Sequence, residues 1–451
     1  MTVSRRGFVS GSLALATAAP FAGCGNGAAR TFREAARDIP VGGEYDLVVA
    51  GGGPAGIAAA IAAARAGRRV KLFESHGALG GIWTSGLLSC IIDFGRADLS
   101  KEIIARLDRL GARMPRRREL VDSNFLYEPE CMKLVLEQLA TEAGVSFTYH
   151  SPVVAAYRDA SGRNVEAVAT ESKSGRRAWK AKFFMDCTGD GDLAALAGCG
   201  FDTGGVNKGD AEQPASLIAL LVVDDDSAIT RFTVDGPKMY AADGAQIYNP
   251  KKELYEEFRR VGVEPSYASP TLFRIRRNMF AFMGNHEYGV KLDNADAVTA
   301  ATVRARQEIF ALVDALVRMG GSKWKGLRVV ATAEQLGHRT ARRIHGRYSI
   351  TVDDLLEGRR FDDAVADCAF GIDVHGVSRA KNRTLPAGSP GGLVAKPYQI
   401  PLRACWAKDL DNLYMAGRCI SGDFLSQASY RVTGPAVEMG ERVARRLFGM
   451  V

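Results

Sequence analysis

The residue types best suited to proton transfer and anion binding are concentrated in one short stretch, from Gln335 to Tyr348. Its sequence, QLGHRTARRIHGRY, contains two of the six histidines of the chain. Histidine accepts protons near neutral pH, and arginine binds carboxylates and other negative groups through several N–H donors. Four residues of this stretch are therefore candidate catalytic residues: His338, Arg339, Arg342 and His345.

Two interpretations of this stretch stay open. On a helix, His338, Arg342 and His345 share one face, because residues three or four positions apart lie above one another. The first interpretation is an exposed basic helix with no catalytic role. The second is a partly buried segment, which the apolar neighbours Leu336 and Ile344 favour, and whose charges then need partners.

His375, in the segment Asp373-Val-His375, is a further candidate for the proton acceptor. It follows a short apolar segment and precedes an expected strand near Tyr398 to Pro401. A histidine between two parts of the chain with different patterns lies where a pocket at a domain boundary is expected. The alternative is a histidine with a purely structural role.

The elements that position a reacting group begin with a strand, a glycine turn and a helix. The apolar run Leu47 to Ala50 predicts a buried parallel strand, and the Ala-rich run Ala55 to Ala66 predicts a helix. Between and within them, Gly51, Gly53 and Gly56 occupy the three glycine positions of GxGxxG. In that order, they permit a tight turn, the approach of backbone to a pyrophosphate, and close packing of the helix on the strand.

A second strand, Val70 to Glu74, ends in an acid about twenty residues beyond the glycine turn. A carboxylate at this position accepts hydrogen bonds from the ribose of an adenosine. The strand, turn, helix and acid together predict a dinucleotide site with its pyrophosphate at the helix N-terminus. A glycine turn without a ligand is the alternative.

Three later segments add glycine turns or polar backbone that suit close contact with a flat ligand. They are Gly80-Gly-Ile-Trp-Thr-Ser-Gly86, Asp186-Cys-Thr-Gly-Asp-Gly-Asp192 and Asn412-Leu-Tyr-Met-Ala-Gly-Arg-Cys-Ile-Ser421. With the GxGxxG unit and the arginine-rich stretch, this ordered set resembles the FAD-dependent oxidoreductase family of the glutathione-reductase-like flavoprotein superfamily. The resemblance covers nearly all of the chain beyond Glu44.

The resemblance implies FAD as the cofactor and assigns two groups of residues to it. The residues implied for the ADP half are Gly51, Gly53, Pro54, Ala55, Gly56 and Glu74. Those implied for the flavin half are Gly80, Gly81, Asp190, Gly417, Arg418 and Ser421. Gln213, in Glu212-Gln-Pro214, is either a polar group near the flavin edge or part of a plain turn.

A flavin supplies the redox chemistry, so the protein must place a substrate bond over flavin N5 and handle one proton and one charge. The function expected is two-electron (hydride) transfer between flavin N5 and a small polar organic substrate, with dehydrogenation as the first choice. The alternatives are a flavin-dependent reductase of an activated double bond and a non-catalytic electron-carrier flavoprotein. An electron acceptor or donor is required as a partner.

The fold class expected is α/β, with a Rossmann-like FAD-binding domain, a parallel sheet with helices, and an inserted α+β substrate or cap domain. The FAD-binding domain is discontinuous, from 44–205 and 395–451, because the apolar run before Gly417 repeats the pattern of a strand that ends in a glycine turn. The cap domain covers 206–394 and includes the arginine-rich segment 335–348. A helix is predicted from about Glu128 to Ala143, with strands following it.

Composition is that of a large globular protein and excludes little else. The 451 residues are 47% hydrophobic and 24% charged, as in a large globular protein with room for two domains. The net charge of +8 is spread along the chain without an aromatic-interleaved basic stripe, so no nucleic-acid partner is expected. The eight cysteines form no CxxC pair and the six histidines no HExxH motif, so no metal site is expected.

The N-terminal residues resemble a targeting signal. Ser4-Arg-Arg-Gly-Phe-Val9, followed by the small apolar run Gly11 to Gly23, resembles a twin-arginine export signal within residues 1–30. This signal predicts export to the periplasm or envelope. Phe21-Ala-Gly-Cys24 also resembles a lipobox, so membrane attachment through a lipid at Cys24 and simple cleavage nearby both stay open.

Overall fold

The computed structural model describes residues 32–115, 122–206, 211–235, 239–240, 246–384 and 387–450. Every described helix and strand belongs to one compact unit, residues 39–451. The twin-arginine motif at Arg5 and Arg6 and the expected lipobox at Cys24 lie outside the described residues.

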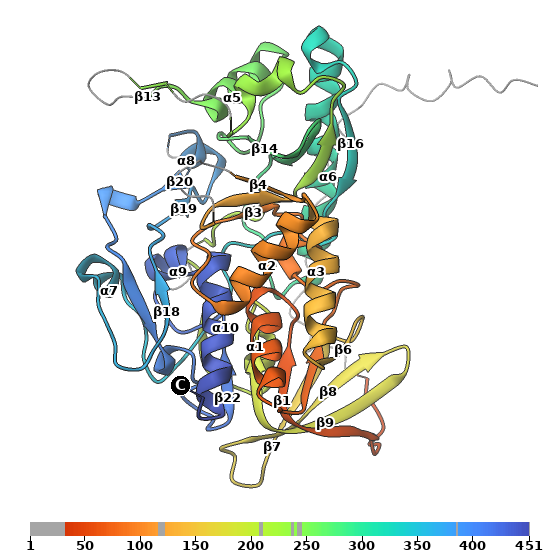
Figure 1. Ribbon diagram of the computed structural model, residues 1–451, viewed down its shortest axis with the longest axis vertical. Coiled ribbons are helices and arrows are strands. Elements are labelled where there is room, and N and C mark those ends of the chain that lie inside the picture. Colours follow the sequence, from red (N-terminus) through yellow and green to blue (C-terminus); the bar gives the residue numbers. More distant parts are fainter. Residues whose placement is uncertain are drawn as a thin grey trace, which may run out of the picture. The chain divides into compact units, whose positions relative to one another are not determined.

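A seven-stranded sheet forms the centre of this unit, in the order β6-β2-β1-β9-β8-β7, with β22 also beside β9 (Figure 1). Its strands are β1 (Val41–Ala50), β2 (Val70–Phe73), β6 (Ser146–Thr148), β7 (Val153–Arg158), β8 (Val165–Ser172), β9 (Gly175–Asp186) and β22 (Leu413–Met415). The β1, β2, β6, β9 and β22 pairings are parallel, whereas β7 and β8 add antiparallel pairings.

The register of this sheet brings the carboxyl ends of four strands to one edge. Ala50, the last residue of β1, pairs with Phe73 of β2 and with Asp186 of β9. Met415 of β22 pairs with Asp186 as well. Ligands of open α/β sheets bind outside the carboxyl ends of the strands, so the turns after these four residues lie where a ligand is expected.

Two helices from opposite parts of the chain pack side by side against this sheet, as Figure 1 shows. They are α1 (Pro54–Arg65) and α10 (Thr433–Leu447). Their close approach depends on Gly440, where a Cβ would overlap the carbonyl oxygen of Ala55. Helix α3 (Pro129–Glu142) packs beside α1, and α2 (Asp98–Arg109) packs against α3 and α10.

A second sheet has a hydrophobic core of its own. It is antiparallel, in the order β14-β15-β11-β16, and its strands are β11 (Ala219–Val222), β14 (Thr271–Arg276), β15 (Met279–Met283) and β16 (Arg328–Thr332). Helices α5 (Pro250–Arg260) and α6 (Ala295–Met319) pack with it. Residues 90–91 (β3), 113–115 (β4) and 125–127 (β5) form a small sheet that contributes Cys90 and Leu126 to the same core.

Shorter elements complete the described chain. They are α4 (Asp192–Leu196), β10 (Phe201–Asp202), β12 (Met239–Tyr240), β13 (Gln246–Tyr248), β17 (Arg343–Ile344), α7 (Val352–Glu357), β18 (Ala364–Cys368), β19 (Val374–His375), α8 (Arg379–Thr384), β20 (Ala387–Gly388), β21 (Tyr398–Pro401) and α9 (Phe424–Tyr430). Short segments of 3-10 helix occur at Gly81–Trp83, Ser227–Phe232, Ser322–Trp324, Pro390–Gly392 and Leu402–Ala404.

The predicted α/β fold with a parallel sheet is confirmed. The predicted helix from Glu128 to Ala143 is α3, and the C-terminal strand joins the sheet of the N-terminal strand through β9. The buried core beside the second sheet ends at Leu336, while apolar residues from Ile344 onward pack in the first core. The segment 344–394, expected within the cap, thus contributes its buried apolar side chains, such as Ile350, Val365 and Ile372, to the core beside the main sheet.

Among the described residues, no helix combines the length and the apolar character needed to cross a bilayer. The described part of the chain also contains no group of three histidine, cysteine, aspartate or glutamate side chains arranged to bind a metal ion.

Candidate active site

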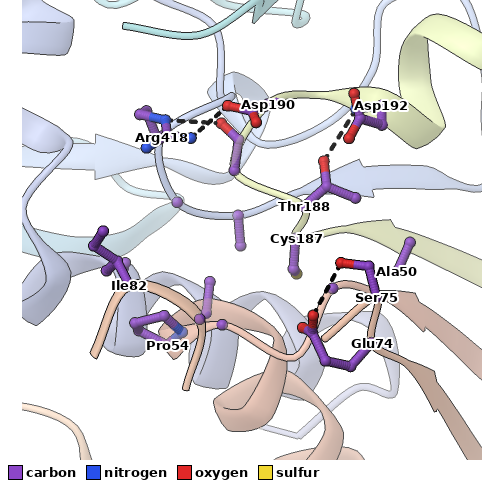
Figure 2. Close-up of a pocket in the computed structure, with 18 of the residues that line it drawn as sticks. Ala50, Pro54, Glu74, Ser75, Ile82, Cys187, Thr188, Asp190, Asp192 and Arg418 are labelled. Carbon is purple, nitrogen blue, oxygen red and sulfur yellow. Dashed lines mark hydrogen bonds and ion pairs between the residues drawn. The ribbon is translucent and has the colours of Figure 1, made fainter. Parts of the chain in front are cut away.

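A pocket lies at the carboxyl edge of the main sheet and is called the first pocket here (Figure 2). Its walls are the turns that follow β1, β2, β9 and β22, together with the start of α10. Nine residues assigned to the cofactor from the sequence line it: Gly51, Gly53, Pro54, Ala55, Glu74, Gly81, Asp190, Gly417 and Arg418.

The glycine turn is crowded against the sheet and open toward the first pocket. Gly51 has φ +93°, and a Cβ there would lie 2.5 Å from the carbonyl oxygen of Cys187. A Cβ on Gly56 would overlap the carbonyl oxygen of Gly51. A Cβ on Gly53 would have only the Cys187 oxygen near it, at 4.0 Å. Only the position of Gly53 therefore leaves room for a ligand beside the backbone.

The N-terminus of α1 provides an anion site at this opening. The helix begins at Pro54 after Gly53, and no side chain caps its first turn. Uncapped N–H groups and the helix dipole both favour a negative group at this end. The open side of Gly53 and the free helix end together form a cradle that suits a pyrophosphate.

Glu74 anchors the glycine turn and can still accept a further hydrogen bond. Its Oε2 accepts a hydrogen bond from the backbone N of Gly52 at 2.7 Å. Its Oε1 accepts from the backbone N of His76 at 2.8 Å and from the Ser75 hydroxyl at 3.1 Å. A carboxylate has about four acceptor positions, so Glu74 can still accept a ribose hydroxyl on the pocket side.

Asp186 holds in place the turn after β9, which forms part of the wall of the first pocket. It is fully buried at the end of β9 and accepts hydrogen bonds from Thr188 and from the backbone N of Ala194. Burial raises the pKa of Asp186 to about 6, although these hydrogen bonds oppose the increase. Asp186 thus fixes the turn between β9 and α4 from within the protein. Thr188 lies at the pocket wall, and its hydroxyl donates to Asp186 and accepts from the backbone N of Asp192 (Figure 2).

Arg418 joins this turn to the turn after β22. Figure 2 shows it paired with Asp190, and its Nε donates to the carbonyl oxygen of Gly189 at 3.0 Å. Its Nη1 donates to the carbonyl oxygen of His338 at 2.5 Å. Arg418 therefore connects the first pocket to the arginine-rich stretch.

Three residues assigned to the cofactor from the sequence lie behind the pocket wall. Gly80, with φ +106°, donates its N–H to Gly52 O and supports the glycine turn. Gly56 faces the sheet, and Ser421 exchanges backbone hydrogen bonds with Ala404 and Ile350. None of these three is among the residues that line the first pocket.

A second pocket adjoins the first and shares Ile82, Arg418, Arg431 and Thr433 with it. It lies between the second sheet and the part of the protein that contains the main sheet. Its cavity volume is about 250 Å³. Most of its exposed lining is apolar, and the polar side chains in its wall are Ser216, Lys251, Tyr267, His338, Arg339, Asp373, His375, Arg418, Arg431 and Thr433. Among the catalytic candidates from the sequence, His338, Arg339 and His375 line it.

His375 lies at the end of β19, with only 5% of its surface exposed. Its Nε2 faces the Asp373 carboxylate at 3.3 Å, and its backbone N donates to Gln213 Oε1 at 2.9 Å. Its Nδ1 has no hydrogen-bond partner among the described residues. Burial and the nearby charge of Arg339 lower the pKa of His375 to about 3, so the ring is neutral at pH 7.

Asp373 is shared between His375 and Arg431. Arg431 Nη2 donates to both the carbonyl oxygen and the Oδ2 of Asp373, each at 3.0 Å. Burial raises the pKa of Asp373, but the hydrogen bond with His375 and the Arg431 charge outweigh it and hold the pKa well below the ordinary value. Asp373 is therefore ionised and fixes a proton on His375 Nε2, which leaves the lone pair on Nδ1.

Arg339 is buried beside this group. Its Nη1 donates to Pro214 O at 2.6 Å and to Ser216 Oγ at 2.9 Å, and its Nη2 contacts Met283 Sδ at 3.6 Å. Burial, followed by repulsion from Arg431, lowers the pKa of Arg339 to about 10. Burial also lowers the pKa of His338, in this case to about 4.

The helix considered for the arginine-rich stretch is wrong. Residues 338–342 are irregular, and Arg343–Ile344 forms a short strand paired with Phe201–Asp202, because the stretch bridges the two cores and satisfies its backbone with distant segments. Arg342 pairs with Asp192 outside the second pocket, and His345 pairs with Asp202 with 45% of its side chain exposed. The stretch is therefore split between buried and exposed positions.

Several residues of the second pocket escaped the sequence analysis. Tyr267 lines it, and its ring stacks on His286 at 4.1 Å between centroids. His286 is buried, its ring lies 5.2 Å from that of His375, and its Nε2 has no partner among the described residues. Thr433 lines both pockets at the start of α10. Neither Tyr267 nor His286 stands in a local motif, and only the Gly434-Pro435 pair signalled the helix start at Thr433.

The chain belongs to the FAD dependent oxidoreductase family, because the model of that family matches residues 46–445. FAD is therefore its cofactor, and the protein is an FAD-dependent oxidoreductase. No curated protein sequence matches the chain at a significant level.

Several solved structures resemble the chain at low identity. A geranylgeranyl bacteriochlorophyll reductase-like protein from Thermoplasma acidophilum is 14% identical, with a TM-score of 0.47 over 90% of this chain and 78% of that one. L-proline dehydrogenase from P. horikoshii is 12% identical, with a TM-score of 0.41 over 92% and 95%. The p-nitrophenol 4-monooxygenase from Pseudomonas putida is 14% identical, with a TM-score of 0.39 over 68% and 70%.

The first pocket suits FAD in the hydrogen-bond donors and acceptors that line it. The open side of Gly53 and the uncapped start of α1 would hold the pyrophosphate, and Glu74 would hold the adenosine ribose. The shared residues Ile82, Arg431 and Thr433 mark where the first pocket continues into the second. The flavin end of the cofactor would approach the second pocket through this junction.

Proposed function

We propose that the protein is a dehydrogenase that binds a small organic substrate in the second pocket and transfers a hydride to FAD. The observation that carries this proposal is the state of His375. His375 lines the second pocket, its Nδ1 has no hydrogen-bond partner among the described residues, and its Nε2 faces the Asp373 carboxylate at 3.3 Å. An imidazole with one unpartnered nitrogen and a carboxylate on the other nitrogen has the arrangement of a general base.

The protein's own residues account for the transfer of the substrate proton. FAD, when bound, takes up the two electrons. His375 accepts the substrate proton at Nδ1, and Asp373, which faces Nε2, stabilises the resulting imidazolium. Arg431 keeps Asp373 ionised, so the proton stays on the ring. The apolar wall of the second pocket excludes water from the reacting atoms.

Reduction of an activated double bond is the second candidate, and one observation favours it. Arg339 lines the same pocket, and its pKa is lowered to about 10, closer to that of a proton donor than an exposed arginine would be. The third candidate, an electron carrier without a substrate site, agrees less well with a second pocket that contains buried, unpartnered polar atoms.

Anaerobic titration of the purified holoprotein distinguishes these candidates. A dehydrogenase loses its flavin absorbance when an organic substrate is added. A reductase, first reduced chemically, regains the absorbance when an activated alkene is added. A carrier responds to neither and exchanges electrons rapidly with a cytochrome or a quinone. Either of the last two results would overturn the dehydrogenase proposal.

We further propose that the protein is a glutathione-reductase-like flavoprotein exported by the twin-arginine route to the periplasm or envelope. The order of the glycine motifs supports the first part, and Ser4-Arg-Arg-Gly-Phe-Val9 supports the second. Twin-arginine export carries folded proteins, which suits a chain that acquires FAD before export. Lipidation at Cys24 would attach it to the membrane, and simple cleavage would release it. Its electron acceptor is then a molecule of the same compartment.

A further inference from the structure

We infer that the substrate is a carboxylic acid with an apolar remainder, and that Arg339 binds its carboxylate. This inference rests on the proposed function, since it assigns the substrate class of the second pocket. The sequence predicted a small polar substrate, and the inference narrows this class to molecules with one carboxylate joined to an apolar body. The charge balance of the pocket, the geometry of Arg339 and the composition of the wall each support it.

Among the described residues, the charge balance of the second pocket leaves one buried cation without a carboxylate partner. Of the other cationic side chains in its wall, Lys251 is only half-buried, and Arg418 and Arg431 pair with Asp190 and Asp373. Arg339, only 8% exposed, forms no ion pair with a carboxylate among the described residues. An isolated buried charge is costly, and a bound anion removes that cost. The pocket therefore favours a ligand with one negative charge near Arg339.

The hydrogen bonds of Arg339 leave donors for such a ligand. Its Nη1 is held by Pro214 O and Ser216 Oγ, which fix the plane of the guanidinium. Its Nη2 has only the sulfur of Met283 at 3.6 Å, and a thioether is a weak acceptor. An arginine fixed at one nitrogen and poorly satisfied at the other is suited to binding a carboxylate.

The rest of the wall selects an apolar body. Leu88, Ile92, Phe273 and Phe370 line the second pocket, and none of them offers a side-chain donor or acceptor. Several polar side chains of the wall already bind protein groups: Arg418 pairs with Asp190, Arg431 with Asp373, and Ser216 binds Arg339 and the carbonyl oxygen of Asn285. A ligand with many hydroxyl groups would compete with these contacts, which disfavours its binding. The observed wall fits an aliphatic or aromatic carboxylic acid.

The test measures ligand binding to the oxidised holoprotein, so it does not depend on turnover. Acetate, butyrate, hexanoate and benzoate are titrated at constant ionic strength, each beside its amide, and binding is followed by the flavin spectrum and by calorimetry. We expect the acids to bind and the amides to bind at least about tenfold more weakly. Affinity rises about two- to fourfold for each added methylene.

The matched variants are Arg339→Met and Arg306→Met. Both remove one positive charge, but Arg306 donates to Thr332 Oγ1 and does not line the second pocket. We expect Arg339→Met to retain FAD and to weaken hexanoate binding about ten- to a hundredfold, while Arg306→Met binds as the wild type does. Arg339→Lys retains part of the affinity.

Three results would overturn the inference. Equal binding of acids and amides by the wild-type holoprotein would exclude a carboxylate site, even if Arg339→Met failed to fold. Unchanged hexanoate binding in Arg339→Met would locate the carboxylate elsewhere. Loss of FAD from a folded Arg339→Met would show that Arg339 neutralises the cofactor. A protein that binds the acids but is reduced by no organic substrate retains this site and loses the proposed dehydrogenase function.

Discussion

Replacing Gly53 by alanine separates cofactor binding from folding. Gly53 has φ −69° and ψ −175°, a conformation that any residue adopts, and a Cβ there would meet nothing closer than 4.0 Å. The apoprotein therefore tolerates the substitution. Alanine has fewer accessible conformations than glycine in the unfolded chain, so the free energy of unfolding should rise by up to about 1 kcal/mol.

The same methyl group occupies the space that the pyrophosphate needs at the start of α1. If it displaces the phosphates from two backbone N–H groups, the loss is about 1.5–3 kcal/mol for each charged hydrogen bond. Two such bonds amount to about 3–6 kcal/mol, which corresponds to a roughly hundred- to ten-thousandfold higher Kd for FAD. Gly53→Val should retain even less cofactor.

Fluorescence titration of the apoprotein with FAD measures this Kd, and thermal unfolding of the apoprotein measures stability. Gly56→Ala is the matched control, because a Cβ there overlaps the Gly51 carbonyl oxygen. We expect Gly56→Ala to lower the Tm of the apoprotein, which Gly53→Ala does not. Wild-type FAD affinity in Gly53→Ala would show that this turn does not bind the pyrophosphate, and the assignment of the first pocket would be wrong.

Three further predictions concern the proton acceptor, pH and export. His375→Ala should retain FAD and slow flavin reduction by substrate on the order of a hundredfold or more, whereas the exposed His345→Ala should not; a normal rate in His375→Ala would contradict the assigned base. Because the pKa of His375 falls from 6.5 to about 3 on folding, the unfolded chain binds more protons between these values. Stability should therefore fall as pH decreases from 6.5 toward 3, and His375→Ala should flatten this dependence of Tm on pH. Changing Arg5 and Arg6 to lysine should retain the protein in the cytoplasm, and unchanged export in fractionated cells would exclude a twin-arginine signal.

The sequence predicted the main sheet because its signals are local. Leu47 to Ala50 is a continuous apolar run that ends in a glycine turn, and the run before Gly417 repeats this pattern. Parallel strands buried on both faces have this pattern, so the shared edge at Ala50 and Met415 followed directly. Glu74 was found for the same reason, since it follows a buried strand at a typical distance from the turn.

The second pocket could be predicted only in part because its residues interact across long separations in the chain. His375 contacts Gln213 and His286, which are 162 and 89 positions away in the chain. Helical spacing grouped Arg342 and His345 with His338, yet the segment is irregular because it pairs with Phe201–Asp202. Periodicity describes contacts within an element, and this stretch has its contacts with other elements.

The contact between α1 and α10 has a consequence for biosynthesis. Ala55 and Gly440 touch although 385 residues separate them, and Arg418 and Thr433 complete the wall that begins at Gly51. A ribosome-bound chain that has emerged only as far as residue 411 lacks β22 and α10, and therefore lacks one side of the first pocket. Stable retention of FAD must accordingly follow translation of these elements, and the loaded cofactor reports that synthesis has passed residue 433.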